Sequence, residues 1–257
     1  MKTVLVTGAN GQLGIAIKAA CANFPKLQFV FASKAELDVT KEEEIAAFFE
    51  NNQLDYCINA AAYTNVDKAE EVPQAAYLLN ETAPRLLAEV CKKYNVFLIH
   101  ISTDYVFDGT KGAPYTIDDT PNPINVYGAS KLAGEKAIAV VGGDYCIVRT
   151  SWLYSEYGSN FQTKILEKLK TSSKLEVVGD LYGTPTYTPN LVVFLLNKIT
   201  KSAFASSMEH FSDGKTMSWH ELAKQLTAVE IKKTAVATLN LKAKRAKNTT
   251  LLNNLNE

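Results

Sequence analysis

The glycine-rich segment Gly8–Gly14 constrains the fold of this chain more than any other feature. It follows directly on a strand-like run, Thr3–Thr7, and reads Gly8-Ala9-Asn10-Gly11-Gln12-Leu13-Gly14. A helical pattern follows near Leu13–Ala22, so the glycines form a turn between a strand and a helix. Residues without a Cβ let the N–H groups of a helix N-terminus approach a phosphate closely. The segment therefore predicts a dinucleotide-binding turn, with an ordinary βα turn as the alternative.

The first half of the chain alternates strand-like and helical segments. Further strands are expected at Gln28–Ala32, Tyr56–Asn59, Val96–Ile101 and Tyr145–Arg149. Further helices are expected at Glu42–Glu50, Ala75–Lys93 and Val126–Val141. This alternation is typical of βαβ units and predicts an α/β fold, a Rossmann-type doubly wound parallel sheet. We expect residues 1–150 to form the dinucleotide-binding domain.

The pattern loosens after about Thr150, where loops separate three helical segments, Asn160–Leu169, Leu191–Ile199 and one near Trp219–Leu226. We expect residues 151–257 to form a smaller C-terminal substrate-binding part, which could be interleaved with the first domain. The tail Lys242–Glu257 is polar and weakly patterned.

Composition excludes several classes of function. With 257 residues and 47% apolar content the chain can bury a full core, and 27 basic residues offset 27 acidic ones. Balanced charge argues against nucleic acid as a partner. The scattered cysteines match no metal spacing, and we interpret His100, His210 and His220 as structural, so no metal site is expected. With neither a membrane-length apolar run nor a cleavable leader pattern, we expect a cytoplasmic protein without a membrane contact.

The choice of cofactor is expected at the end of the second strand, where Ser33 and Lys34 stand. An acid at this point would bind a ribose 2′-OH, so its absence favours NADPH, although nearby Glu36 leaves NADH open. Asp38 either caps the next helix or contacts the adenine. The small residues after Asn59 would admit a flat cofactor, or reflect simple strand-end packing. The residues predicted to bind the cofactor are Gly8, Asn10, Gly11, Gln12, Leu13, Gly14, Ser33, Lys34, Asp38, Val39, Ala60, Ala61, Ala62, Tyr63, Tyr127 and Lys131.

Tyr127 and Lys131 are predicted to share one face of a helix, because they are four residues apart. An ammonium about 4 Å from the phenol would favour the phenolate by up to about 4 kcal/mol, before the opposing effect of desolvation, and so lower the pKa of Tyr127. Such a tyrosine can protonate a carbonyl oxygen as a general acid, with Lys131 also free to bind ribose. The spacing also arises by chance, and a solvated helix face is the alternative.

The strand before this helix ends His100-Ile101-Ser102-Thr103-Asp104. A hydroxyl here would face the same cleft, and Thr103 could bind the substrate carbonyl, with Ser102 as the alternative. The alternative is that Thr103 only caps the strand and has no role in binding.

With these features in order, the chain resembles the extended short-chain dehydrogenases, and within them the dTDP-4-dehydrorhamnose reductase family. The closest strings are Asn59–Thr64, Val66–Glu70, Ser102–Gly109, Arg149–Tyr154 and Gly183–Thr186, and the resemblance runs from Met1 to about Leu226. It implies reduction of the C4 keto group of a nucleotide-linked sugar, dTDP-4-dehydro-L-rhamnose, by NADPH or NADH. A homodimer is compatible with it. The alternatives are a non-catalytic NADP-binding regulatory subunit and a nucleotide-sugar epimerase or dehydratase.

The resemblance also implies roles for single residues. Tyr127 would protonate the oxygen, Thr103 would polarise the carbonyl, and Lys131 would tune Tyr127 and bind ribose. The residues implied in substrate binding are Thr103, Asp104, Tyr127 and Trp152. Trp152 could equally be a core aromatic, and Asn80 is expected to support a proton relay.

The chain departs from the family pattern at two places. Asn190 stands where the family has an acidic residue after Pro185-Thr186, and Lys244-Arg245-Ala246-Lys247 replaces the usual Arg-Pro and closing helix. We therefore expect incomplete closure of the substrate-binding part, or closure supplied by a partner.

Overall fold

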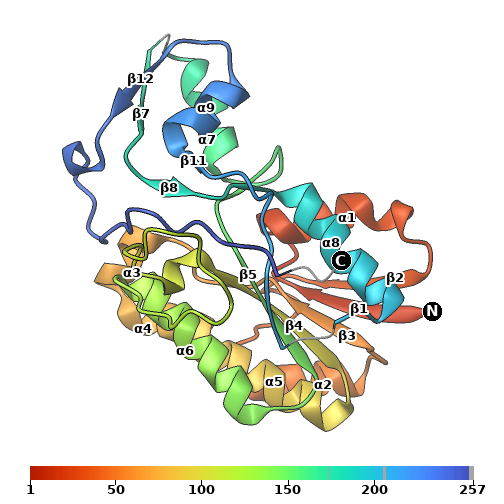
Figure 1. Cartoon of the computed structure of the whole chain (residues 1–257). Helices are drawn as coiled ribbons and strands as arrows, with labels where there is room; N and C mark the ends of the chain where they lie inside the picture. The colour runs from red at the N-terminus through yellow and green to blue at the C-terminus, as the bar shows by residue number, and fades with distance from the viewer. Residues whose placement is uncertain (173, 205–206, 255–257) are drawn as a thin grey trace.

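A parallel β-sheet forms the centre of the molecule (Figure 1). The computed structural model describes residues 1–172, 174–204 and 207–254, and within these ranges six strands form this sheet. In spatial order they are β2 (Leu27–Ala32), β1 (Lys2–Thr7), β3 (Tyr56–Asn59), β4 (Phe97–Thr103), β5 (Tyr145–Thr150) and β10 (Met208–His210). The α/β class with a doubly wound parallel sheet is thus confirmed.

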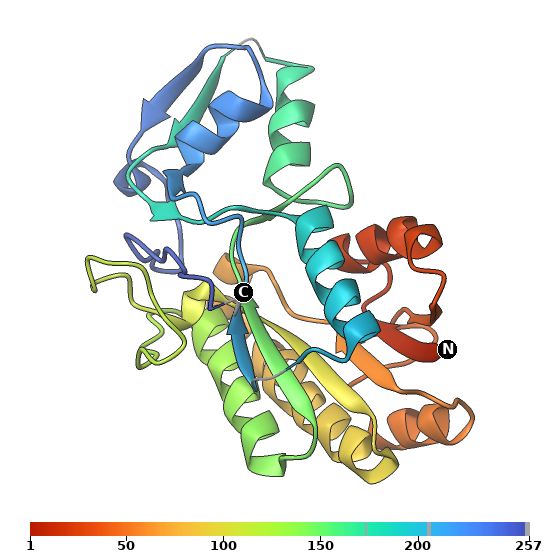
Figure 2. The same cartoon turned by 45° about the vertical axis from the view of Figure 1, so that its right-hand side comes forward.

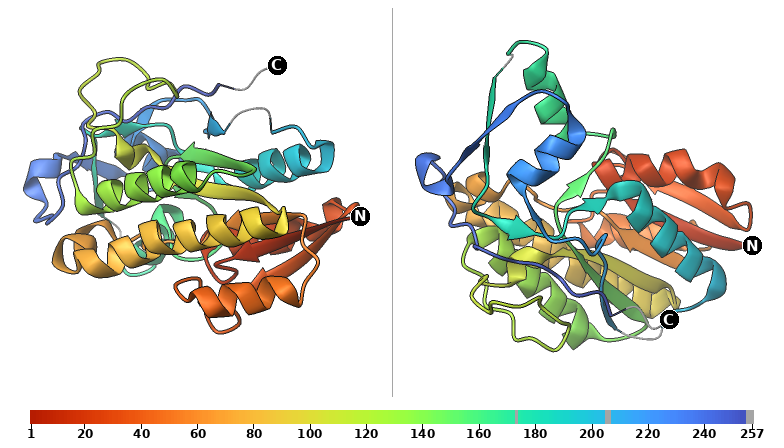
Figure 3. Two further views of the ribbon diagram at one scale, coloured as in Figure 1. Left: turned by 90° about the horizontal axis from the view of Figure 1, so that it is seen from below. Right: turned by 45° about the horizontal axis from the view of Figure 1, so that its top comes forward.

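Helices cover both faces of the sheet (Figures 1 and 3). One face carries α1 (Gln12–Ala20) and α8 (Thr188–Lys201). The other carries α2 (Glu42–Glu50), α5 (Ala83–Tyr94) and α6 (Val126–Val141). The predicted bounds of the helices at 42–50 and 126–141 are those of α2 and α6.

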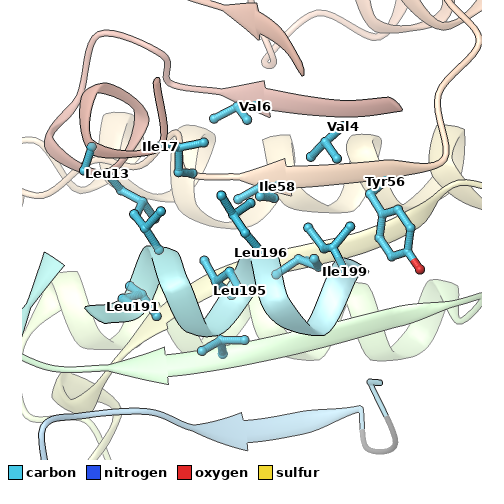
Figure 4. Packing of buried hydrophobic residues seen from close by; sticks show 14 of the residues in the cluster. Val4, Val6, Leu13, Ile17, Tyr56, Ile58, Leu191, Leu195, Leu196 and Ile199 are labelled. Carbon is cyan, nitrogen blue, oxygen red and sulfur yellow. The ribbon is translucent and has the colours of Figure 1, made fainter. Parts of the chain in front are cut away.

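The core on the first face is built by apolar residues at helical spacing in α8. Figure 4 shows these side chains against Val4 and Val6 of β1, Ile58 of β3 and Ile17 of α1. The α8 residues that it labels are Leu191, Leu195, Leu196 and Ile199. All are fully buried, and removing a buried aliphatic side chain of this size typically costs 2–5 kcal/mol.

The helix predicted at Ala75–Lys93 is interrupted by a wider turn. It consists of α4 (Pro73–Tyr77), a π-helical turn η2 (Leu78–Thr82) and α5. Gly134 of α6 lies against this turn, where an added Cβ would come within 2.0 Å of the Asn80 carbonyl oxygen. A π turn places an extra residue in the helix without ending it, which apolar periodicity does not report.

The strand order reverses between β1 and β3, and ligands of such sheets bind at the carboxyl ends of the strands flanking this point. Gly8 follows β1 with a φ of +64°, and a Cβ there would lie 2.8 Å from the Ala61 nitrogen that follows β3. A Cβ at Gly14 would lie 2.6 Å from the Gly8 carbonyl oxygen. The glycine spacing is therefore required by backbone contacts at the reversal.

A smaller layer lies beyond the carboxyl ends of the strands (Figure 2). It packs α7 (Phe161–Leu169) and α9 (Trp219–Leu226) on the parallel pair β7 (Leu175–Val178) and β12 (Ile231–Thr234). The bounds predicted for the helix at 219–226 are confirmed. Shorter elements are η1 (Cys21–Asn23), α3 (Val66–Glu71), η3 (Asp104–Val106), β6 (Leu153–Tyr154), β8 (Tyr182–Gly183), β9 (Thr186–Tyr187), β11 (Met217–Ser218) and η4 (Val236–Thr238).

The chain crosses between the two layers repeatedly. Both α8 and β10 come from residues 151–257, yet they belong to the sheet layer. Residues 151–257 therefore contribute to both layers, and the division at residue 150 stays a prediction. No helix in the described ranges has the length and apolar character that crossing a membrane requires.

Residues 242–254, here called the C-terminal strap, run back across both layers. The Arg245 guanidinium contacts Asp67 at 2.7 Å, and Asn248 and Leu251 form β-bridges with Tyr182 and Tyr115. The Asn253 side chain accepts a hydrogen bond from the Ser212 N–H at 2.8 Å. Polar side chains thus anchor the strap without a helix, and incomplete closure of the substrate-binding part, or closure supplied by a partner, stays a prediction.

Candidate active site

A cavity of about 810 Å³, here called the cleft, opens at the carboxyl ends of β1, β3, β4 and β5. This volume suits a cofactor or small ligand. The sequence-predicted residues that line it are Asn10, Gly11, Gln12, Leu13, Ala60, Ala62, Thr103, Tyr127, Lys131 and Trp152. The structure thus brings the three predicted catalytic residues, Thr103, Tyr127 and Lys131, into one cavity.

A second cavity of about 410 Å³, here called the side pocket, adjoins the cleft and shares Gly11, Ala60 and Ala62 with it. Its other lining residues from the predicted set are Gly8, Lys34, Asp38, Val39, Ala61 and Tyr63. Gly14 and Ser33 line neither cavity. Gly14 instead allows the helix to pack on the turn, as its Cβ contact shows.

The end of β2 presents one exposed cation to the side pocket. The side chain of Lys34 is 86% exposed, with its Nζ 3.9 Å from an Asp38 carboxylate oxygen. Asp38 accepts hydrogen bonds from the N–H and the hydroxyl of Thr40, which lower its pKa. It therefore stabilises the turn before α2, whose N-cap is Lys41. Glu36 accepts from the Ser33 N–H at 2.6 Å, so the acid nearest the end of the strand is used within its own turn.

Tyr127 lies in the first turn of α6, which Asn125 caps by accepting the Gly128 N–H at 2.8 Å. Its ring makes an edge contact with the Tyr105 ring at 5.5 Å. Burial raises the pKa of Tyr127 to about 12; the Thr103 side chain opposes this rise and the Asp104 charge adds to it. The predicted lowering of this pKa by Lys131 is wrong here, because burial outweighs every group that favours the phenolate.

Lys131 lies one turn further along α6 and is fully buried. Its Nζ donates to the Ile101 carbonyl oxygen at 2.7 Å and lies 3.0 Å from His100 Nε2. Burial lowers the pKa of Lys131 to about 8, against the opposing charge of Glu135. Shared helix phase brings Tyr127 and Lys131 to the same cleft, as predicted, and both hydrogen bonds of the Lys131 Nζ are with β4.

Thr103 ends β4 and presents its hydroxyl to the cleft. This hydroxyl donates to the Asp104 carboxylate at 3.2 Å and accepts from the Tyr105 N–H at 3.2 Å. The alternative, Ser102, donates its hydroxyl to Glu135, which also forms a buried bidentate ion pair with Arg149. Thr103 is therefore the better candidate for contact with a substrate.

Asp104 is placed behind Thr103 and does not line the cleft. Its carboxylate accepts hydrogen bonds from the hydroxyls of Thr103 and Thr249, the latter on the strap. Burial raises the pKa of Asp104 to about 7, and the two hydroxyls oppose the rise. Asp104 therefore does not face the cleft directly, and the contact with the sugar nucleotide that the resemblance implied for it stays a prediction.

Trp152 packs as an aromatic between the two layers and also faces the cleft, and its contact with a substrate stays a prediction. Its ring stacks on Trp219 with centroids 3.6 Å apart, and Gly183 provides space beside the indole, since a Cβ there would lie 2.7 Å from it. The residue has a φ of +49° and also lines the cleft. It links the smaller layer to the site.

Asn80 supports the cleft from the π turn. Its amide accepts from the Tyr63 N–H at 2.8 Å and donates to the Ser130 hydroxyl at 3.0 Å. It thereby ties the loop after β3 to α6.

Asn190 stands where the family pattern has an acidic residue. Its side chain donates to Asp213 at 3.0 Å, so an acidic group is present beside the start of α8.

Among the residues at the site that the sequence did not predict, three carry ionisable side chains that bear on the chemistry. His100 contacts Lys131, and Lys164 and Arg245 line both the cleft and an apolar cavity of about 710 Å³ beneath the smaller layer. Lys164 lies within a helical pattern and Arg245 in the weakly patterned tail, so neither carried a local signal. The predicted absence of a metal site stays a prediction; in the described ranges no group of three or more His, Cys, Asp or Glu could hold a metal ion.

Comparison with known proteins places this site in a family. The family model described as RmlD substrate binding domain matches residues 1–257. A dTDP-4-dehydrorhamnose reductase of Burkholderia thailandensis is 38% identical over 232 residues, 88% of this chain and 77% of the relative. A dTDP-4-keto-6-deoxy-D-glucose reductase of Streptomyces niveus is 35% identical over 221 residues, 86% of this chain and 76% of the relative.

A solved structure gives the same result for the fold. The crystal structure of dTDP-4-dehydrorhamnose reductase from Bacillus anthracis strain Ames in complex with NADP has a TM-score of 0.94. It is 34% identical in sequence, and the match covers 99% of this chain and 92% of that chain. Sequence, fold and site geometry therefore agree that this chain, which is similar to dTDP-4-dehydrorhamnose reductases, belongs to the RmlD substrate-binding family.

Proposed function

We propose that this chain uses NADPH to reduce the C4 keto group of dTDP-4-dehydro-L-rhamnose to dTDP-L-rhamnose. The observation that carries the proposal is the meeting of Thr103, Tyr127 and Lys131 in one cleft beside the glycine-rich turn. Family membership supports the choice of substrate.

The residues present fit a dinucleotide. The N-terminus of α1 has no side-chain cap, which leaves first-turn N–H groups available to a diphosphate. The Lys34 ammonium would bind a 2′-phosphate in the side pocket. Ala60, Ala61 and Ala62 leave space there for a flat ring system. When bound, NADPH supplies the hydride that reaches the carbonyl carbon.

The side chains of the cleft would then donate the proton and stabilise the charge that remains. With its pKa raised to about 12, Tyr127 is protonated at neutral pH and can donate its phenolic proton to the carbonyl oxygen. The Thr103 hydroxyl can hydrogen-bond the same oxygen and hold it beside the phenol. Lys131, with a pKa of about 8, is largely charged at pH 7 and would stabilise the phenolate left after the transfer.

The substrate class is supported by the way two cavities meet. The apolar cavity and the cleft share Lys164 and Arg245, which provide two cations at their junction. A diphosphate between these cations would place an apolar base on one side and the sugar in the cleft. The ion pair with Asp67 holds the Arg245 guanidinium at this junction before a ligand binds.

The test is a turnover assay with the purified chain. We expect NADPH consumption with dTDP-4-dehydro-L-rhamnose, and a loss of about 10²- to 10⁴-fold in kcat for Tyr127→Phe with the fold intact. The panel should include dTDP-4-keto-6-deoxy-D-glucose, the substrate in the name of the Streptomyces niveus relative.

Two results would count against the reductase. Tight NADP binding with no turnover of any keto sugar would indicate the regulatory-subunit alternative. Bound dinucleotide that is never released between turnovers would indicate an epimerase or dehydratase.

We also propose a cytoplasmic location. The four cysteines are all described and none forms a disulfide, as expected in a reducing compartment.

A further inference from the structure

A row of buried polar side chains crosses the sheet behind Lys131. His100 of β4, Asn59 of β3 and Thr7 of β1 are direct register partners. His100 Nδ1 lies 3.0 Å from Asn59 Nδ2, and the Thr7 hydroxyl donates to Asn59 Oδ1 at 2.8 Å. The Ala61 N–H, beside the side pocket, is 3.4 Å from the Thr7 hydroxyl. Each of these side chains is essentially inaccessible to water, so their hydrogen bonds must be satisfied within the row.

We propose that His100 is a positioning residue for Lys131, holding its amine toward the cleft and setting the pH at which that amine loses its charge. This inference rests on the proposed function for its consequence in catalysis. An ammonium has three N–H donors. The Ile101 carbonyl and His100 Nε2 occupy two directions around Nζ, and the third is left for the cleft that Lys131 lines.

The hydrogen-bond partners couple the charge of Lys131 to the tautomer of His100. Burial and the Lys131 charge hold the pKa of His100 well below its usual range, so the ring stays neutral with one N–H. With the Asn59 amide nitrogen facing Nδ1, the ring proton is on Nε2 and Lys131 must be the neutral amine that accepts it. With the amide turned over, Nδ1–H donates to the amide oxygen and Nε2 accepts from a charged Lys131. The heavy-atom positions fit both arrangements.

Among the described residues, His100 is the ionisable group that directly contacts the Lys131 amine, and the other ionisable groups nearby have different partners. Glu135, one turn along α6, raises the pKa of Lys131 but is itself paired with Arg149 of β5. His210 of β10 lies beyond Arg149 at 3.5 Å. Tyr127, one turn back, has its pKa governed by burial, Thr103 and Asp104. The Nζ hydrogen bonds go to β4 alone, within the described residues.

Two substitutions separate the contacts of His100. Asn at this position can replace Nδ1 toward Asn59 but does not reach Lys131, whereas Gln can place an amide oxygen near the Nε2 position. We expect His100→Asn to move the alkaline limbs of NADPH binding and of kcat to lower pH by about one unit. His100→Gln should restore both limbs toward the parent values. His220→Asn, at a histidine of the smaller layer that hydrogen-bonds the Ile231 carbonyl, is the matched control and should shift neither limb.

The binding measurement uses NADPH alone, followed by fluorescence from pH 6 to 10, and so does not depend on the sugar. Unshifted limbs in His100→Asn, or equal shifts in both variants, would reduce His100 to a packing role. Should His100→Asn fail to fold, ¹⁵N NMR of the parent chain decides: the His100 tautomer should change over the pH range in which Lys131 titrates, and a constant tautomer overturns the proposal. Failure of every keto sugar to react, with these shifts present, would reject the proposed function but not this inference.

Discussion

Lys34 is the residue at which a preference for NADPH is most directly tested. Its side chain is exposed and its contact with Asp38 is long, so this ion pair contributes little to stability. We expect Lys34→Ala to raise the KM for NADPH about tenfold, the loss of one charge-assisted phosphate contact, and to leave the KM for NADH unchanged. Steady-state kinetics with both cofactors measure this. Lys26→Ala, at an exposed lysine far from the side pocket, is the control; equal effects on NADPH and NADH would contradict the assignment.

Asp104 should make stability depend on pH near neutrality. Its pKa of about 7 in the folded chain lies above its ordinary value of 3.8, so the folded state holds a proton that the unfolded state releases. The stabilisation linked to this proton is complete below pH 4 and is lost as the pH rises through 7. Urea unfolding from pH 4 to 8 should show this decline, and Asp104→Asn should flatten it. Parallel curves for the two proteins would show that Asp104 is ionised when folded.

At this scale the sequence predicted which residues meet but not how their charged ends are arranged. The four-residue spacing of Tyr127 and Lys131 fixed their common helix face, and strand order fixed Thr103 beside them. The direction of the Lys131 amine depends on His100, which is near in space only because β4 lies under α6. Desolvation, which governs the pKa values of Tyr127 and Lys131, is a property of the assembled site.

At the scale of elements, α6, which carries Tyr127, packs closely against the π turn. Alanine normally stabilises a helix relative to glycine by about 0.5–1 kcal/mol. Gly134→Ala should do the reverse, because its Cβ would come within 2.0 Å of a backbone oxygen that cannot rotate away. We expect a loss of about 1–3 kcal/mol in the free energy of unfolding, measured by urea denaturation, and a lower kcat. A more stable variant would show that α6 is not packed this tightly.

The helices at 42–50 and 126–141 were predicted with their correct bounds, and elements defined by their neighbours were not. The helix at 42–50 has its acidic first turn and apolar face written in the sequence. By contrast β10 is a three-residue strand, Met208–His210, with two polar residues, and it exists because β5 offers it a parallel partner. The strap is ordered by single contacts such as Asp67 to Arg245, which no local pattern announces.

At the scale of the whole molecule, the interleaving predicts that the first 150 residues do not fold alone. A fragment of residues 1–150 lacks α8, and so exposes the apolar face formed by Val4, Val6 and Ile58. We expect a collapsed, aggregation-prone fragment without cooperative unfolding, whereas the full chain should unfold in one transition followed by circular dichroism. A dispersed NMR spectrum from the fragment would show that it is an independent domain.

The late origin of β10 also matters while the protein is being made. The strand that covers the outer side of β5 is synthesised only after α7, β7 and α8, and it emerges from the ribosome after them. Until then the nascent chain carries an unpaired parallel edge next to a hydrophobic surface, the combination that favours pairing with a neighbouring chain. The speed with which residues 151–210 emerge and dock should therefore govern the yield of native protein in the cell.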